Sequence, residues 1–197
     1  MSNLVIAEHD QNTLKSSTLS AVTAALAIGG DVDILVCGKG ADDVAKSAAL
    51  VCGVSKVIHV DNEIYEHQLA ECVAPLVSEI GKTYSGVLTP ATTTGKNLLP
   101  RVAALLDVSQ ISDIVNVKSN NVFQRPIYAG NAIATVESSD SIKVITVRAT
   151  AFSEAEVGEI AAPIEDVSLV FAQELSQFIS ERLSQSERPE LTSAGII

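Results

Sequence analysis

The chain has 197 residues, of which 47% are apolar and only 4% aromatic, so an α/β core has to be packed mainly from Ala, Val, Ile and Leu. Its net charge is −11, and residues 153–197 hold nine acidic and two basic side chains, which is −7 of that total. No basic stripe is present, which excludes nucleic acid as a partner, and no apolar run reaches the roughly 20 residues that a membrane-inserted helix needs.

Apolar runs of strand length alternate with helical patterns over residues 1–110. Strands are predicted at Leu4–Ala7, Asp33–Cys37, Lys56–Val60 and Gly86–Thr89. Helices are predicted at Lys15–Ile28, Ala41–Val51 and Ile64–Ile80, the last one kinked or interrupted by Pro75. This alternation predicts an α/β fold with a Rossmann-like, doubly wound, mainly parallel sheet and right-handed crossovers.

Another helix follows the fourth predicted strand. Asn97 is expected to be its N-cap, which places Pro100 in the first turn, where a missing N–H costs least. Leu98, Val102 and Leu105 recur at helical spacing and are expected to face the sheet. A helix that starts just after a strand points its N–H groups at a ligand or a partner. The candidate residues for an anion or subunit contact here are Gly95, Lys96, Asn97 and Arg101.

Two glycine-containing turns fall short of phosphate-binding motifs. A Walker A loop needs Gly five residues before its Gly-Lys pair and Ser or Thr after the Lys, but Pro90 and Asn97 occupy those positions. Gly38-Lys39-Gly40 resembles half of a dinucleotide fingerprint, yet Asp43 stands where the third Gly is required. Structural turns are favoured at both places.

The histidines, their acidic neighbours and the cysteines indicate few candidate chemical sites. Glu8-His9-Asp10 follows the first strand, where these residues either contact a ligand or a subunit or simply end the strand. His59 is expected to be a satisfied core residue, and His67 to be solvated on an acidic helix. Three cysteines without metal-type spacing are expected to be free and buried, one in a strand and two in helices: Cys37, Cys52 and Cys72.

The pattern changes after residue 110. Short β-type runs joined by Asn- and Ser-rich turns predict a small antiparallel β extension from Ile114–Val117, Val122–Ile127, Ala132–Val136 and Lys143–Arg148, with Val144, Ile145 and Val147 in the core. The turn Tyr128-Ala129-Gly130-Asn131 contains Gly130 and Asn131, two residue types that tolerate left-handed backbone. Together with Arg125 this turn has either a local role or an interface role.

The acidic remainder of the chain has little periodicity. Residues 153–166 are expected to form a mobile loop or linker, and Val167–Phe171 a further strand. Phe178–Leu183 is compatible with a short helix or with extended chain.

Several ordered motifs are similar to one family. They are Asn3-Leu4-Val5-Ile6-Ala7-Glu8-His9, Gly95-Lys96-Asn97-Leu98-Leu99-Pro100-Arg101-Val102-Ala103-Ala104-Leu105-Leu106, Ile111-Ser112-Asp113-Ile114, Ile127-Tyr128-Ala129-Gly130-Asn131-Ala132 and Ser186-Glu187-Arg188-Pro189-Glu190-Leu191-Thr192. In this order they resemble the amino-terminal domain of the electron transfer flavoprotein alpha subunit. The similarity extends over essentially the whole chain.

The resemblance implies a scaffold that contacts the beta subunit of a FAD-dependent electron carrier. Such a carrier takes electrons from flavin dehydrogenases such as acyl-CoA dehydrogenase in fatty acid β-oxidation. It passes them to the electron transfer flavoprotein–quinone oxidoreductase and so to the respiratory quinone pool. Most FAD contacts lie in a second domain of the family, so this chain alone is expected to bind little or no flavin and to catalyse nothing.

The resemblance also implies a division of the chain and a compartment. Residues 1–152 are expected to form the α/β domain with its extension, residues 153–191 an acidic segment that completes it, and residues 192–197 the start of the FAD-binding domain. The expected compartment is the cytoplasm in a bacterium or the mitochondrial matrix in a eukaryote. The competing interpretation is a stand-alone nucleotide-binding module of the universal-stress-protein type, although the Gly-rich phosphate loop of those proteins is not visible in this sequence.

Overall fold

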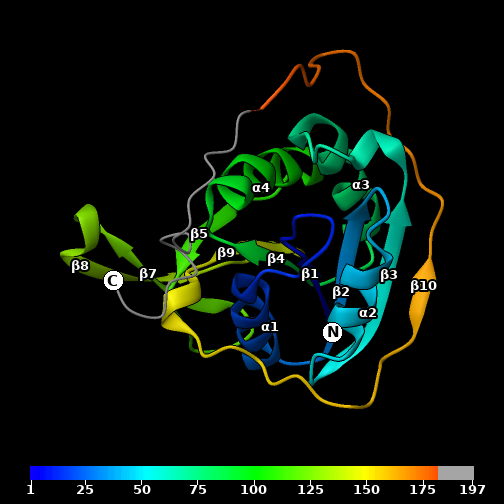
Figure 1. The fold of residues 1–197 in the computed structure, drawn as a ribbon. Coiled ribbons are helices and arrows are strands. Elements are labelled where there is room, and N and C mark those ends of the chain that lie inside the picture. The colour runs from blue at the N-terminus through cyan, green and yellow to red at the C-terminus, as the bar shows by residue number, and fades with distance from the viewer. Residues whose placement is uncertain (182–197) are drawn as a thin grey trace, which may run out of the picture.

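A seven-stranded parallel sheet forms the body of the molecule. The computed structural model describes residues 1–181 (Figure 1). The strand order is β10-β3-β2-β1-β4-β9-β5, and every neighbouring pair is parallel. The strands are β1 (Ser2–Ile6), β2 (Asp31–Gly38), β3 (Val54–Asp61), β4 (Gly86–Pro90), β5 (Gln110–Ile114), β9 (Lys143–Val147) and β10 (Ile164–Asp166). The predicted α/β fold is therefore confirmed, with the first four strands adjacent and parallel.

Helices cover both faces of this sheet and enclose two apolar cores. They are α1 (Ser16–Ile28), α2 (Asp42–Ala49), α3 (Ala70–Gly81) and α4 (Thr93–Leu106). Successive strand residues serve opposite cores, because Val5 packs with α1 and α2 whereas Leu4 and Ile6 pack with α3 and α4. Strands buried on both faces produce the continuous apolar runs seen in the sequence.

The predicted helix Ile64–Ile80 is wrong in its first part. A short 3₁₀ turn, η1 (Glu63–Tyr65), begins where the Asn62 side chain accepts a hydrogen bond from the Ile64 N–H, and α3 starts only at Ala70. Gln68 between them is left-handed, with a φ of 47°. The interruption therefore precedes the helix, and Pro75 lies inside α3.

The antiparallel extension is present, but its membership differs from the prediction. It consists of β6 (Asn116–Val117), β7 (Val122–Ile127) and β8 (Ala132–Glu137), and we call residues 116–137 the arm. Ile114 belongs to β5 of the main sheet. The predicted strand Lys143–Arg148 is β9, which lies parallel between β4 and β5, and Val144, Ile145 and Val147 are buried as expected. Burial on both faces explains this placement, since an edge extension leaves one face in water.

Residues 153–166 form a belt that is hydrogen-bonded to the body. Residues 153–163 of this belt contain no helix or strand, as expected of a loop. The Cys52 N–H donates to the Glu156 carbonyl at 2.8 Å, and the Gly158 N–H donates to the Leu50 carbonyl at 2.8 Å. The belt then supplies β10, which pairs with β3. The predicted strand Val167–Phe171 is wrong, because the pairing ends at Asp166.

The segment after β10 is held mainly by side chains. Val167, Leu169 and Phe171 pack against the core under α3 and α4. The buried Tyr65 hydroxyl donates to the Leu169 carbonyl and accepts from the Phe171 N–H, both at 3.1 Å. Of the segment Phe178–Leu183, residues 178–181 are not helical and the rest lies outside the described residues.

The structure confirms some of the predicted positions and burial of the histidines and cysteines and corrects others. His59 is buried, and its Nδ1 lies 2.8 Å from a carboxylate oxygen of Asp166, but within residues 1–181 its Nε2 finds no partner. His67 is exposed as expected, although it lies in a turn and stacks on Phe178. Cys37 and Cys72 are buried, whereas Cys52 occupies a turn after α2 and is exposed.

No helix in the described part of the chain is long and apolar enough to cross a membrane.

Candidate functional site

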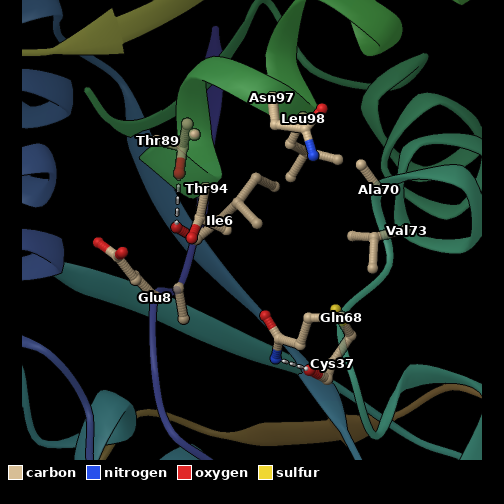
Figure 2. A pocket seen from close by; sticks show the side chains of 12 residues that line it. Ile6, Glu8, Cys37, Gln68, Ala70, Val73, Thr89, Thr94, Asn97 and Leu98 are labelled. Atoms are coloured by element: carbon tan, nitrogen blue, oxygen red, sulfur yellow. Dashed lines mark hydrogen bonds between the residues drawn. The ribbon is translucent and has the colours of Figure 1, made fainter. Parts of the chain in front are cut away.

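The carboxyl edge of the sheet is the first candidate site, because ligands of open parallel sheets bind where the strand order reverses. Here the reversal lies between β1 and β4, at the start of α4. Figure 2 shows side chains of several elements around the cavity at this point. Its volume is about 30 Å³, room for a water molecule or two. Its polar lining comes from Glu8, Gln68, Thr89, Thr94 and Asn97, with Gly95 beside them.

The start of α4 differs from the prediction. Thr92 is the N-cap, and its hydroxyl accepts a hydrogen bond from the Gly95 N–H at 3.2 Å, so the assignment of Asn97 is wrong. Pro100 consequently lies inside the helix and not in its first turn. Leu98 and Val102 are buried as predicted, but Leu105 is 56% exposed, and Leu99 and Ala103 share the buried face instead. Thr92, Thr93 and Thr94 are all of a residue type that can cap a helix N-terminus, so the sequence alone does not identify the N-cap.

The two cations of this helix do not meet at the cavity. Lys96 is exposed and is not among the lining residues. Arg101 points to α3, where its Nη2 lies 2.9 Å from a carboxylate oxygen of Glu71. Gly95 and Asn97 line the cavity, so the structure separates the four candidate residues of this segment into two pairs.

His9 at the end of β1 is fixed by hydrogen bonds. Its Nδ1 accepts from the Gln11 N–H at 3.1 Å, so the ring is neutral, and its Nε2 lies 3.0 Å from the Cys37 carbonyl oxygen and 2.8 Å from the Gln68 side-chain amide nitrogen. The Gln68 side-chain amide donates to the same carbonyl at 2.8 Å. Burial lowers the pKa of His9, which favours this neutral form.

The residues on either side of His9 are also paired within the chain. Glu8 accepts a hydrogen bond from the Ser17 hydroxyl at 2.9 Å. Asp10 pairs with Lys15 at 2.8 Å, and this contact, together with hydrogen bonds from Thr13, lowers the pKa of Asp10. Glu8-His9-Asp10 therefore ends the strand and organises the following turn. Among residues 1–181, no cluster of three or more His, Cys, Asp or Glu side chains has the arrangement of a metal site.

The Gly38-Lys39-Gly40 turn is closed by side chains of the same chain. The Lys39 N–H donates to Gln11 Oε1 at 3.1 Å, and the Gly40 N–H donates to a carboxylate oxygen of Asp61 at 2.9 Å. Two of the amides that a phosphate would need are thus occupied. Gln11, with a φ of 71°, also donates to the Glu66 carbonyl, and sequence reasoning gave no signal for this bridging role.

These observations determine which ligands fit. A second cavity, at the amino edge of the sheet near Asn3 and Lys143, has a volume of about 90 Å³. Pockets for drug-sized ligands have volumes of about 300–1,000 Å³. Neither of these two cavities has room for FAD or a nucleotide.

The tip of the arm is the second candidate site. Tyr128, Ala129 and Gly130 have φ values of 50°, 52° and 91°, so two residues with side chains are left-handed. Asn131 has a φ of −73°, so of the two residues whose types tolerate this conformation only Gly130 adopts it. Left-handed backbone costs about 1–2 kcal/mol for an ordinary L-residue. Nothing in the sequence marks Tyr128 for it.

Arg125 lies near this tip, opposite Ala134 of β8. Its Nε is buried, and it has no hydrogen-bond partner within the described part of the chain. Tyr128 is 79% exposed and Ile133 is 54% exposed. Arg125 lies in β7, and Tyr128 and Asn131 lie in the turn that follows it, so these three candidates belong to the arm and not to the group at α4.

Comparisons with known proteins agree with this architecture. The model of the electron transfer flavoprotein domain family matches residues 3–172. Over all 197 residues the chain is 57% identical to electron transfer flavoprotein subunit alpha of Pseudomonas aeruginosa, of which it covers 64%. It is 49% identical to the protein of the same name from Bradyrhizobium diazoefficiens, of which it covers 62%.

A mitochondrial relative is also similar. It is electron transfer flavoprotein subunit alpha of Dictyostelium discoideum, 46% identical over 210 aligned positions that include 98% of this chain and 59% of the relative. The chain therefore spans somewhat less than two thirds of the length of these curated relatives.

Proposed function

Because the chain belongs to the electron transfer flavoprotein domain family, we propose that it acts as the amino-terminal domain of an electron transfer flavoprotein alpha subunit, a scaffold that binds the beta subunit. The filled carboxyl edge of the sheet supports this scaffold role. The carboxyl edge of the sheet, where a ligand would sit, is filled by Gln11, Gln68 and Asp61 and leaves a cavity of about 30 Å³.

The whole protein is proposed to be a FAD-dependent electron carrier. It would take electrons from acyl-CoA dehydrogenase and other flavin dehydrogenases and deliver them to the electron transfer flavoprotein–quinone oxidoreductase. FAD, when bound, supplies the electron-accepting chemistry, and the protein orients the cofactor and tunes its potential. Residues 192–197 would begin the domain that holds most of the flavin. The compartment would be the bacterial cytoplasm or the mitochondrial matrix.

The candidate contact residues belong to two groups under this proposal. One group is at the start of α4 and comprises Gly95, Lys96, Asn97 and Arg101. The other group is on the arm and comprises Arg125, Tyr128 and Asn131. The Arg101–Glu71 ion pair already accounts for one member of the first group, since it ties α4 to α3.

Co-expression with the beta subunit of the same source tests the proposal. The expected result is a stable pair on size exclusion, while the purified chain alone shows no stoichiometric flavin absorbance. A thermal-shift series of the chain alone with ATP, AMP and FAD is expected to leave the unfolding midpoint unchanged. A nucleotide-dependent rise, with no complex formed, would favour the stand-alone nucleotide-binding module instead.

A further inference from the structure

The segment after β10 is attached to the body by side chains. Its backbone pairs with the sheet only as far as Val167, whose N–H donates to the His59 carbonyl at 2.8 Å. Within the described part of the chain, no backbone–backbone hydrogen bond joins residues 168–181 to the body. We call residues 168–178 the strap, and in Figure 1 they belong to the orange segment that runs on from β10 over the α3 side of the molecule. Side-chain contacts therefore determine whether the strap stays in place.

Alternate residues at the start of the strap face the body. Leu169 and Phe171 pack against the apolar core under α3 and α4, whereas Val170 between them is 50% exposed. This alternation is typical of an extended chain that covers an apolar surface with one of its faces. Hydrophobic contacts of this kind are non-directional, so they hold the strap down without fixing its register.

The register of the strap is fixed by Tyr65, which lies in the turn of residues 63–68. Its hydroxyl donates to the Leu169 carbonyl and accepts from the Phe171 N–H, both at 3.1 Å. One phenol can do both, because a hydroxyl group carries a donor and acceptor lone pairs. The Tyr65 side chain is fully buried, so the strap and the body together exclude water from it.

The same turn makes a second contact with the strap. The His67 ring stacks on the Phe178 ring, with centroids 3.7 Å apart and an angle of 14° between the planes. The turn itself is fixed to the sheet, because the Gln68 side-chain amide donates to the Cys37 carbonyl at 2.8 Å (Figure 2). The turn of residues 63–68, which interrupts the predicted helix, thus presents two rings to the strap.

The far part of the strap is held together internally. The Gln173 side-chain carbonyl accepts hydrogen bonds from the N–H groups of Leu175 and Ser176, and its amide donates to the Ser176 carbonyl at 3.0 Å. Its contact with the body is a long one, 3.5 Å to the Cys72 sulfur. The internal hydrogen bonds do not require the body, so residues 173–176 can move together.

We propose that the strap is a latch that opens as one unit while the sheet stays folded, and that Tyr65 holds it closed. Its hinge is at Val167, because β10 stays paired with β3 up to Asp166. Opening uncovers the Tyr65 ring and the apolar surface beneath Leu169 and Phe171, so the strap controls access to that surface. Few contacts oppose the opening, which therefore costs less free energy than global unfolding. This inference goes beyond the proposed function and does not depend on the beta subunit.

Native-state hydrogen exchange of the full chain tests whether the strap opens separately from the sheet. The Phe171 amide is expected to exchange at a rate that low concentrations of urea leave unchanged, because local opening exposes little surface. The amide of Ile34 in the central strand β2 is expected to exchange more slowly and to accelerate with urea, because it needs global unfolding. Equal rates and an equal urea dependence at both positions would overturn the inference.

Two tyrosine variants test the latch itself. Tyr65→Phe removes the hydroxyl and keeps the ring, so cleavage after Phe171 by chymotrypsin is expected to accelerate about tenfold. Cleavage is the appropriate readout because a protease must bind a longer stretch of released chain than the one residue whose hydrogen bond is lost. Tyr84→Phe is the matched control, since Tyr84 is also buried but its hydroxyl donates to Asp33 of β2.

The control variant is expected to keep cleavage after Phe171 within about threefold of the wild type, even though it lowers the stability of the sheet. An unchanged cleavage rate in Tyr65→Phe would overturn the role of Tyr65 as the latch. Equal acceleration in both variants would show that cleavage follows global unfolding and would overturn the separate opening. Neither result would affect the proposed function.

Discussion

The main sheet and the arm tip differ in how well their residue types suit the backbone conformation and the burial that they adopt. In the sheet, residues such as Leu4, Val5 and Ile34 are fully buried, and local preference and tertiary packing favour the same structure. At the arm tip, Tyr128 and Ala129 adopt backbone conformations that their residue types disfavour, and Tyr128 remains exposed. The main sheet therefore supplies most of the buried apolar surface that stabilises this chain, whereas the arm tip keeps two residues in disfavoured backbone conformations.

The largest expected effect concerns Gly95 in the body. A Cβ at this position would lie 2.0 Å from the Pro90 carbonyl oxygen and 2.8 Å from Thr89 Cγ2, because α4 approaches the end of β4 closely. Gly95→Ala is expected to lower the free energy of unfolding by about 3 kcal/mol, measured by urea denaturation.

Gly130→Ala on the arm is the matched control for this change. No atom lies within 4 Å of the position of its Cβ, so only its φ of 91° opposes the substitution. The expected loss is about 1 kcal/mol. We expect the free energy of unfolding to fall more at Gly95, where the added Cβ would clash, than at Gly130, where only the backbone conformation is unfavourable. Equal losses of stability at the two positions would contradict this difference.

A substitution by glycine is expected to have opposite signs in the two regions. Ala129→Gly relieves a left-handed alanine and is expected to stabilise the protein by about 1 kcal/mol. Ala103→Gly in α4 removes a buried methyl group and a good helix former, and it is expected to destabilise by about 1–2 kcal/mol. Thermal unfolding of both variants checks this prediction, and destabilisation by Ala129→Gly would show that the tip is not strained.

A smaller effect is expected from pH at the carboxyl edge. Burial lowers the pKa of His9 in the folded state, so between that value and about 6.5, its value in an unfolded chain, the unfolded state binds more protons. Stability therefore falls as the pH falls below about 6.5, with a slope under about 1.4 kcal/mol per pH unit.

His9→Gln tests this assignment by removing the titrating group. The stability of the variant, followed by urea denaturation between pH 7 and 5, is expected to lose that part of the slope. The pKa of Asp10 is lowered by Lys15, so its contribution is present above about pH 4 and is lost only as the pH falls further. That acid loss should persist in the variant, and an unchanged slope between pH 7 and 5 would rule out His9 as its source.

Sequence patterns predicted the parts of the fold that local chemistry determines. The four central strands were recognisable because strands buried on both faces need continuous apolar runs, as in Asp33–Cys37. The strand Lys143–Val147 was also recognisable, but its pairing with β4 and β5 depends on a return from the arm that no local pattern specifies. The attachment of the belt to the body was not predicted, because it depends on backbone hydrogen bonds to residues distant in the sequence such as Leu50.

The candidate sites were predictable only in part. Gly95 and Asn97 do line a cavity, as the sequence analysis expected of a ligand-contacting segment. The predicted N-cap was wrong, because α4 begins at Thr93 with Thr92 as its N-cap, and tertiary packing determines which of several threonines caps the helix. The side chains that close the carboxyl edge, Gln11 and Gln68, act through contacts with other loops and carry no sequence signal. The left-handed backbone of Tyr128 was likewise not predictable, because tyrosine disfavours positive φ.

Amide hydrogen exchange of the chain, measured free and in complex with the beta subunit, tests the division between a closed body and a presenting arm most directly. We expect binding to slow exchange over residues 122–133, at the end of the arm, and to leave residues 8–12 and 92–97 at the carboxyl edge unchanged. Slowed exchange at the carboxyl edge, with an unchanged arm, would contradict the account.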